Sequence, residues 1–199
     1  MSFPGPGTNL AYSAQRSTVM ILGDSISAAY GIQRKTGWVA LLKKRLSALS
    51  APISVINASV SGETTGGGLA RLRQALDAHD PAVVVIELGG NDGLRGYPIE
   101  RIRENLNRIV ALAKIDSRQV LLIGMQIPPN YGPRYTRAFT GMFAEIAEAH
   151  EIALVPFFLQ EVALTPELMQ RDGIHPTADA QTILLDTMWP YLEGLLRID

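Results

Sequence analysis

Three polar segments, far apart in the sequence, together contain a nucleophile, a carboxamide donor and an acid–base pair: Gly23–Ser27, Gly89–Asp92 and Asp172–His175. A serine hydroxyl is a poor nucleophile until a base takes its proton, so a candidate serine requires a candidate histidine. The first segment provides Ser25, the second provides Asn91 as a carboxamide donor, and the third provides a histidine preceded by an aspartate. These segments are the candidate site.

The chain contains three histidines, and the general base can be found by elimination. His79 and His150 fall at predicted helix ends, where cations are favoured, and we expect both to be solvent-exposed. His175 lies in a glycine-containing loop three residues after Asp172. An aspartate at this spacing can accept the Nδ1 proton, fix the tautomer and leave Nε2 facing a serine. The alternative is an Asx-type loop with a histidine at the entry to a helix.

Each of the other motifs also has an ordinary structural interpretation. Ser25 could be the N-cap of the next helix, Asn91 could belong to an Asn-Asp-Gly turn, and Gly62 alone indicates only a tight turn. The first segment is not a Gly-x-Ser-x-Gly elbow, because Ser27 occupies the fifth position. For acyl transfer, the N–H groups of Ser25 and Gly62 and the side-chain amide of Asn91 would be suitable donors to the oxyanion.

The two acidic neighbours of these motifs have different expected roles. Asp24 is adjacent to Ser25, so we expect it to anchor the turn by hydrogen bonds rather than to act as the acid of a triad. Asp92 could bind a metal together with Asp24, but no third ligand is near in the sequence. We therefore predict no metal site.

Short apolar runs rich in β-branched residues alternate with longer stretches of helical period. The apolar runs, predicted to be buried strands, are residues 18–22, 53–56, 82–88, 120–123 and 152–155. The predicted helices are residues 38–49, 69–78 after a glycine-rich turn at 66–68, 99–110, 139–147, and one from Pro176 toward Leu196. Pro176 suits a first helical position, whereas Pro190 should kink or interrupt this last helix.

The continuous apolar strands indicate a parallel sheet that is covered on both faces. Five strand–helix alternations predict a three-layer α/β/α sandwich with a five-stranded parallel sheet in the flavodoxin-like order 2-1-3-4-5. Ligands bind outside the carboxyl ends of the strands in such sheets. Ser25, Gly62 and Asn91 follow the first, second and third predicted strands, so we expect them at the same edge.

The overall composition narrows the function classes further. The chain has 199 residues, 47% of them hydrophobic, and a net charge of -1. We expect a single domain over residues 18–199 after a loose N-terminal arm, residues 1–17, without the apolar core of an intact signal peptide. The charge gives no reason to expect nucleic acid as a partner, and no apolar stretch reaches the length of a membrane span. The absence of cysteine excludes disulfides and thiolate chemistry.

Four blocks in order resemble the SGNH-hydrolase superfamily, the GDSL-type esterases: residues 23–27, 57–62, 89–92 and 172–175. The likeness extends from about residue 18 to the last helix, with Ile26 in place of the usual leucine. Longer strings resemble the bacterial branch of thioesterases, lysophospholipases and arylesterases, namely residues 87–96, 126–132, 156–159 and 172–176.

The resemblance implies that Ser25 is the nucleophile, that His175 acts as base and then as acid, and that Asp172 orients it. It implies an oxyanion hole made by Ser25, Gly62 and Asn91. It also implies cleavage of carboxylic esters and acyl thioesters, of the arylester, acyl-CoA or lysophospholipid type, through an acyl-enzyme without cofactor or metal. A periplasmic or secreted location is suggested by the family alone, and a cytoplasmic one stays open.

The family likeness also predicts a mobile loop at residues 93–98, where glycines are placed to act as hinges. Several apolar loop residues could line an acyl groove or could simply be packed: Tyr30, Leu94, Tyr97, Ile127, Pro128 and Tyr131.

Two other functions compete with this interpretation. One is an acetyl-sugar esterase of the same superfamily. The other is a flavodoxin-like nucleotide-binding module, which would need a phosphate cradle after the first strand. The sequence contains neither Gly-x-Gly-x-x-Gly nor a P-loop lysine.

Overall fold

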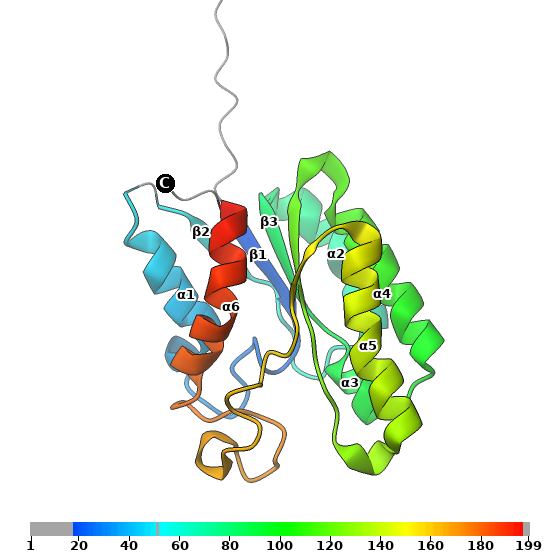
Figure 1. Ribbon diagram of the computed structural model, residues 1–199. Coiled ribbons are helices and arrows are strands. Elements are labelled where there is room, and N and C mark those ends of the chain that lie inside the picture. Colours follow the sequence, from blue (N-terminus) through cyan, green and yellow to red (C-terminus); the bar gives the residue numbers. More distant parts are fainter. Residues whose placement is uncertain (1–17, 51, 197–199) are drawn as a thin grey trace, which may run out of the picture.

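A computed structural model describes residues 18–50 and 52–196 (Figure 1). Its sheet has five parallel strands in the order β2-β1-β3-β4-β5, which confirms the predicted order. The strands are β1 Thr18–Gly23, β2 Ser54–Asn57, β3 Val83–Glu87, β4 Gln119–Ile123 and β5 Ala153–Val155. Each predicted strand agrees with the observed one to within one residue at either end. The predicted arm, residues 1–17, lies outside the described residues, and the single domain over 18–199 stays a prediction.

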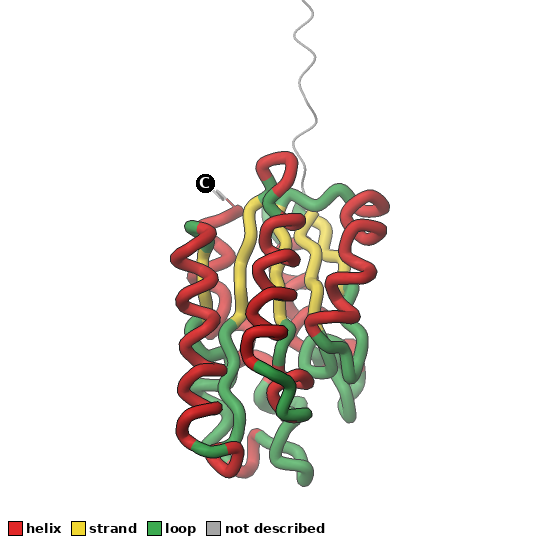
Figure 2. Tube along the Cα trace, turned by 90° about the vertical axis from the view of Figure 1, so that its right-hand side faces the viewer, coloured by secondary structure: helices red, strands yellow, loops and turns green. Residues whose placement is uncertain are grey.

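Helices cover both faces of this sheet. They are α1 Trp38–Ser47, α2 Thr65–His79, α3 Gly90–Leu94, α4 Ile99–Ala113, α5 Pro133–His150 and α6 Gln181–Leu196. Short 3-10 turns lie at η1 Arg34–Thr36, η2 Ile115–Ser117, η3 Pro129–Tyr131 and η4 Pro166–Leu168. Helices α1 and α6 cover one face, and α2, α4 and α5 cover the other (Figure 1). Figure 2 shows the helices of the second layer in front of the strands.

Two hydrophobic cores explain why the strands are apolar at nearly every position. Successive residues of β1 alternate between the cores: Met20 and Leu22 pack toward α2, α4 and α5, whereas Val19 and Ile21 pack toward α1 and α6. A strand that is buried on both faces cannot show polar alternation. The α/β/α sandwich is therefore the direct outcome of the sequence pattern.

The strand register brings the ends of the first three strands together. Gly23, the last residue of β1, pairs with Glu87, the last residue of β3, and Ile21 pairs with Asn57 at the end of β2. The segments after these strands therefore leave the sheet at the same edge, the lower edge in Figure 1.

The predicted starts of three helices were wrong. Helix α2 begins at Thr65, so residues 66–68 are helical rather than a turn, and the Thr64 hydroxyl caps the helix by accepting the Gly67 N–H at 3.3 Å. Helix α5 begins at Pro133, six residues before the predicted start. The last helix begins at Gln181 because Pro176 bridges Met169 and the Thr177 N–H donates to the Leu168 carbonyl at 2.8 Å.

Pro190 does not interrupt helix α6, which continues to Leu196. Proline removes one helical hydrogen bond, the one to the carbonyl four residues earlier. Here that carbonyl belongs to Asp186, which is exposed like Pro190 itself. Water can therefore replace the missing donor. No helix among the described residues is both long and apolar enough to cross a membrane.

Candidate active site

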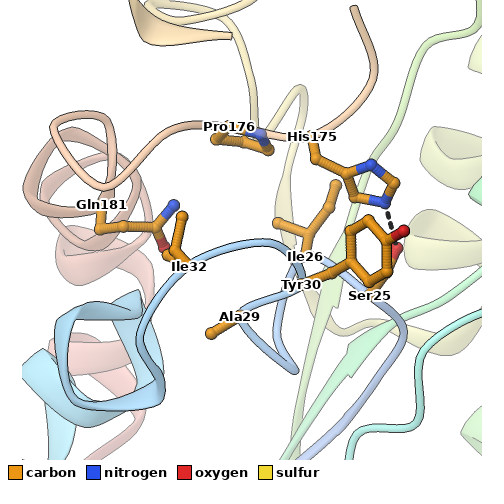
Figure 3. A pocket seen from close by; sticks show the side chains of 8 residues that line it. All are labelled: Ser25, Ile26, Ala29, Tyr30, Ile32, His175, Pro176 and Gln181. Atoms are coloured by element: carbon orange, nitrogen blue, oxygen red, sulfur yellow. Dashed lines mark hydrogen bonds between the residues drawn. The ribbon is translucent and has the colours of Figure 1, made fainter. Parts of the chain in front are cut away.

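The structure brings Ser25, His175 and Asp172 into one hydrogen-bonded chain. His175 Nε2 lies 2.8 Å from Ser25 Oγ, a contact that Figure 3 shows as a dashed line, and His175 Nδ1 lies 2.7 Å from Asp172 Oδ2. Because an ionised carboxylate can only accept, Nδ1 carries the imidazole proton and Nε2 accepts the serine hydroxyl. This is the tautomer that a general base needs.

The turn after β1 presents Ser25 at the edge of the sheet. Within this turn the Ala28 N–H donates to the Asp24 carbonyl at 3.0 Å and the Tyr30 N–H donates to the Ser25 carbonyl at 3.0 Å. The next helical element begins only at Arg34. Ser25 is therefore not a helix N-cap, and its side chain is free to interact with His175.

The loop that carries His175 is organised by Asp172. Asp172 Oδ1 accepts the N–H groups of Ile174 at 2.9 Å and of His175 at 3.0 Å, while Oδ2 faces the ring. Asp172 therefore forms an Asx-type turn through Oδ1 and pairs with the imidazole of His175 through Oδ2. Partial burial works to raise the pKa of Asp172, but these hydrogen bonds from His175 and Ile174 outweigh it and lower the pKa to about 2. Asp172 is therefore ionised at neutral pH.

Asn91 and Gly62 lie on the segments that follow β3 and β2. Asn91 is in the short helix α3, not in a turn, and its Nδ2 donates to Asp24 Oδ2 at 3.1 Å. Gly62 is exposed, has a φ of +79° that disfavours any side chain, and accepts a hydrogen bond from Arg95 at its carbonyl oxygen at 3.2 Å. Their roles as oxyanion donors stay predictions.

The two aspartates next to the motifs both have structural roles. Asp24 Oδ1 accepts the Ile26 N–H at 3.1 Å, which agrees with its predicted role as an anchor of the turn. Asp92 accepts the Thr65 hydroxyl at 2.7 Å and the Thr65 N–H at 2.8 Å, so it holds the start of helix α2. Among residues 18–50 and 52–196, no group of three or more His, Asp or Glu residues could hold a metal ion.

Sequence reasoning missed Glu87, a fully buried residue at the end of β3 that contacts the turn after β1. Its Oε2 accepts the Ser27 hydroxyl at 2.6 Å and the Asp24 N–H at 3.1 Å. Burial, and then the charge of Asp24, raise the pKa of Glu87 well above its usual value, and burial raises the pKa of Asp24 to about 6. A signal was present: Glu87 is the one charged residue in the apolar run 82–88.

The apolar residues predicted to line an acyl groove lie mostly in packed positions. Leu94, Tyr97 and Tyr131 pack against the core beside buried Ile127, whereas Pro128 is exposed. The Tyr131 hydroxyl donates to the Leu94 carbonyl at 2.7 Å. The pocket next to Ser25 lies elsewhere, between the β1 turn and the His175 loop (Figure 3). It is lined by Ser25, Ile26, Ala29, Tyr30, Ile32, His175, Pro176 and Gln181.

The other two histidines lie outside this site. His79 is exposed at the end of helix α2, as expected. His150 is only half-exposed, and its Nε2 lies 2.8 Å from Asn107 Oδ1, so its predicted solvent exposure is only partly confirmed. Neither contacts Ser25, and His175 is the histidine that does.

Tyr30 provides one wall of the pocket and contacts the candidate base. The centroid of its ring lies 4.6 Å from that of the His175 ring, and the two ring planes are inclined by 40°. Gln170 Nε2 donates a hydrogen bond to the Tyr30 carbonyl at 2.9 Å. An aromatic contact of this kind contributes about 0.5–1.5 kcal/mol, so Tyr30→Ala is expected to lower kcat/KM by about 2- to 10-fold. Tyr30→Phe keeps the ring and should stay near wild type in the same ester-hydrolysis assay. Equal losses in both variants would show that the hydroxyl matters instead.

Comparison with known proteins agrees with this geometry. Residues 21–183 match the GDSL-like lipase/acylhydrolase family. The chain is 49% identical to esterase TesA of Pseudomonas aeruginosa over 94% of this chain and 93% of that protein. It is 42% identical to thioesterase 1/protease 1/lysophospholipase L1 of Escherichia coli K12, over 94% and 88%. The crystal structure of psychrotrophic esterase EstA from Pseudoalteromonas, inhibited by monoethylphosphonate, superposes with a TM-score of 0.86 at 43% identity, covering 90% of this chain and 98% of that one.

Proposed function

Because this chain belongs to the GDSL-like lipase/acylhydrolase family, we propose that Ser25, His175 and Asp172 hydrolyse carboxylic esters and acyl thioesters through an acyl-enzyme intermediate. The observation that carries this proposal is the hydrogen-bonded chain from Asp172 Oδ2 through the imidazole of His175 to Ser25 Oγ, with contacts of 2.7 and 2.8 Å. It is the arrangement by which a serine hydroxyl becomes a nucleophile at neutral pH.

In the acylation step, Ser25 Oγ attacks the substrate carbonyl carbon while His175 Nε2 takes the hydroxyl proton. The imidazolium is stabilised by the Asp172 carboxylate. The tetrahedral intermediate then collapses, its bond to the leaving oxygen or sulfur breaks, and His175 returns the proton to the leaving group. A water molecule, activated by His175 in the same way, hydrolyses the acyl-serine and regenerates the free enzyme.

The negative charge that develops on the carbonyl oxygen requires hydrogen-bond donors. We assign these to the N–H groups of Ser25 and Gly62 and to the amide of Asn91. The amide has two N–H bonds, and the contact with Asp24 at 3.1 Å occupies only one of them. Asp24 therefore fixes the plane of the amide and leaves the second N–H available to the oxyanion.

Asn91→Ala is expected to lower kcat by about 10²–10³-fold, because it removes a preorganised donor to the oxyanion. Its KM should change little, since the donor acts mainly on the transition state. Asn107→Ala is the matched control, because Asn107 contacts His150 on another part of the molecule. Steady-state kinetics on one soluble ester would check both variants. A near-normal kcat in Asn91→Ala would remove Asn91 from the oxyanion hole.

The substrate class is tested by a panel of acyl esters and acyl thioesters with increasing acyl length, together with acetylated sugars. We expect turnover of aryl esters and of acyl-CoA thioesters by the same site, so that one serine-directed inhibitor abolishes both. Activity confined to acetylated sugars would instead favour the sugar esterase. Activity on neither class would contradict the proposal.

Family likeness also leads us to propose that the protein works in the periplasm or is secreted. Fractionation of cells that produce the protein, followed by the ester assay, would test this. Recovery of the activity with the cytosolic marker enzyme would contradict it.

A further inference from the structure

Glu87 is a buried carboxyl group that two residues of the nucleophile turn around Ser25 use as a hydrogen-bond acceptor. It accepts hydrogen bonds from the Asp24 N–H and from the Ser27 hydroxyl, on either side of Ser25. A Cβ atom at Gly23 would lie 2.7 Å from Glu87 Oε2, so only glycine leaves room for this carboxyl beside β1. Asp24 and Ser27 thus share one hydrogen-bond partner that is some 60 residues away in the sequence, and Gly23 leaves room for it.

Asp24 connects this buried carboxyl to the candidate oxyanion donor. Its main chain donates to Glu87, and its side chain accepts the Asn91 amide at 3.1 Å and the Ile26 N–H at 3.1 Å. The Ser25 turn and the Asn91 amide are therefore positioned by the same pair of carboxyl groups.

The surroundings of Glu87 favour its neutral form. Within residues 18–50 and 52–196, no lysine or arginine forms an ion pair with Glu87 or Asp24. The β4 residues that pair with Val84, Val85 and Ile86 are apolar. The Asp92 carboxylate on α3 accepts hydrogen bonds from Thr65. Burial raises the pKa of Asp24, and the charge of His175 opposes this shift at Asp24, not at Glu87. None of the described residues donates a hydrogen bond to Glu87 Oε1. A protonated Oε1 would also lack a partner, but a neutral group costs much less to bury than a charged one, so the protonated form is favoured.

We propose that Glu87 is a positioning residue that works in its protonated form: it holds the nucleophile turn through Asp24 and Ser27, and leaves the single negative charge of the pair on Asp24, where it orients Asn91. This inference rests on the proposed roles of Ser25 and Asn91.

Two substitutions separate this role from simple packing. Glu87→Gln keeps a neutral group with an oxygen acceptor for both donors and is expected to retain at least about a third of the wild-type kcat. Glu87→Met has a similar length but no oxygen, so two buried donors lose their acceptor and the turn shifts. We expect it to lower kcat by about 10- to 100-fold with little change in KM. A loss in Glu87→Gln as large as in Glu87→Met would overturn the proposal, as would a wild-type kcat in Glu87→Met.

The protonation of Glu87 can also be tested by the pH dependence of stability, which does not depend on activity. If the folded protein keeps this proton above the usual pKa of glutamate while the unfolded chain releases it, the free energy of unfolding of wild type falls as the pH rises. Glu87→Gln lacks this titration. The Tm of Glu87→Gln minus that of wild type should therefore increase steadily from pH 5 to pH 8. A difference that is constant over this range would mean that Glu87 is ionised in the fold and would overturn the proposal, even if Glu87→Met fails to fold.

Labelling with a fluorophosphonate distinguishes failure of this inference from failure of the proposed function. Wild type that does not react at Ser25 would contradict the proposed function itself. Wild type that reacts, together with a Glu87→Met variant that reacts equally fast, would contradict only the positioning role. The expected result is slower labelling of Ser25 in Glu87→Met and near-normal labelling in Glu87→Gln.

Discussion

Replacing Ser25 by alanine is expected to lower kcat for ester and thioester substrates by about 10⁶-fold, which is the scale of losing the nucleophile of a serine hydrolase. The substitution removes the one atom that would form the acyl-enzyme. Ser25 Oγ contacts His175 Nε2 at 2.8 Å and its residue is only 8% exposed, so alanine fits in the same space and the fold should persist. Steady-state kinetics and the Tm of the purified variant check both expectations.

Ser47→Ala is the matched control for this experiment. Ser47 is an exposed residue at the end of helix α1, where its hydroxyl donates to the Lys44 carbonyl at 2.9 Å rather than to a histidine. It should retain wild-type kcat. Substantial turnover by Ser25→Ala, after contamination is excluded by inhibitor titration, would assign the chemistry to another residue.

Replacing His175 by alanine is expected to cost nearly as much, about 10⁶-fold in kcat, because a serine without its base is no longer activated. The sharper test is the double variant. Residues that act as one unit are not additive, so Ser25→Ala/His175→Ala should be no slower than Ser25→Ala alone. Asp172→Asn should lose about 10⁴-fold, because an amide at Oδ2 favours the wrong imidazole tautomer.

His150→Ala is the control for the histidine variant, since His150 contacts Asn107 and not Ser25. Its kcat should equal that of wild type. Independent, multiplying losses in the double variant would mean that Ser25 and His175 do not act on the same proton, and the hydrogen-bonded chain would then have no catalytic role.

The sequence predicted the fold well because the sheet is buried on both sides. Strands such as β1 and β3 are apolar at nearly every position, so their limits follow from composition to within one residue. His175 could also be found, because there are only three histidines and one of them follows an aspartate in a loop. The chemistry of the candidate site was therefore largely visible in the local sequence.

What the sequence could not predict depends on contacts between residues that are not neighbours in the sequence. Pro176 satisfies the local rule for starting a helix, yet its bridge to Met169 delays helix α6 until Gln181. The role of Glu87 could not be predicted, because it depends on the strand register that places Glu87 beside Gly23. Tyr30 faces His175 only because the loop after β5 folds back over the β1 turn. No periodicity or short motif carries this information.

The most direct test of the account is to treat the purified protein with a fluorophosphonate and to identify the modified residue by peptide mass spectrometry. A phosphonate mimics the tetrahedral intermediate and bonds covalently to an activated serine. We predict one adduct per chain, on Ser25, formed in parallel with the loss of esterase activity and greatly slowed in His175→Ala. An unmodified Ser25 in inactivated enzyme, or an adduct on a different serine, would contradict the account.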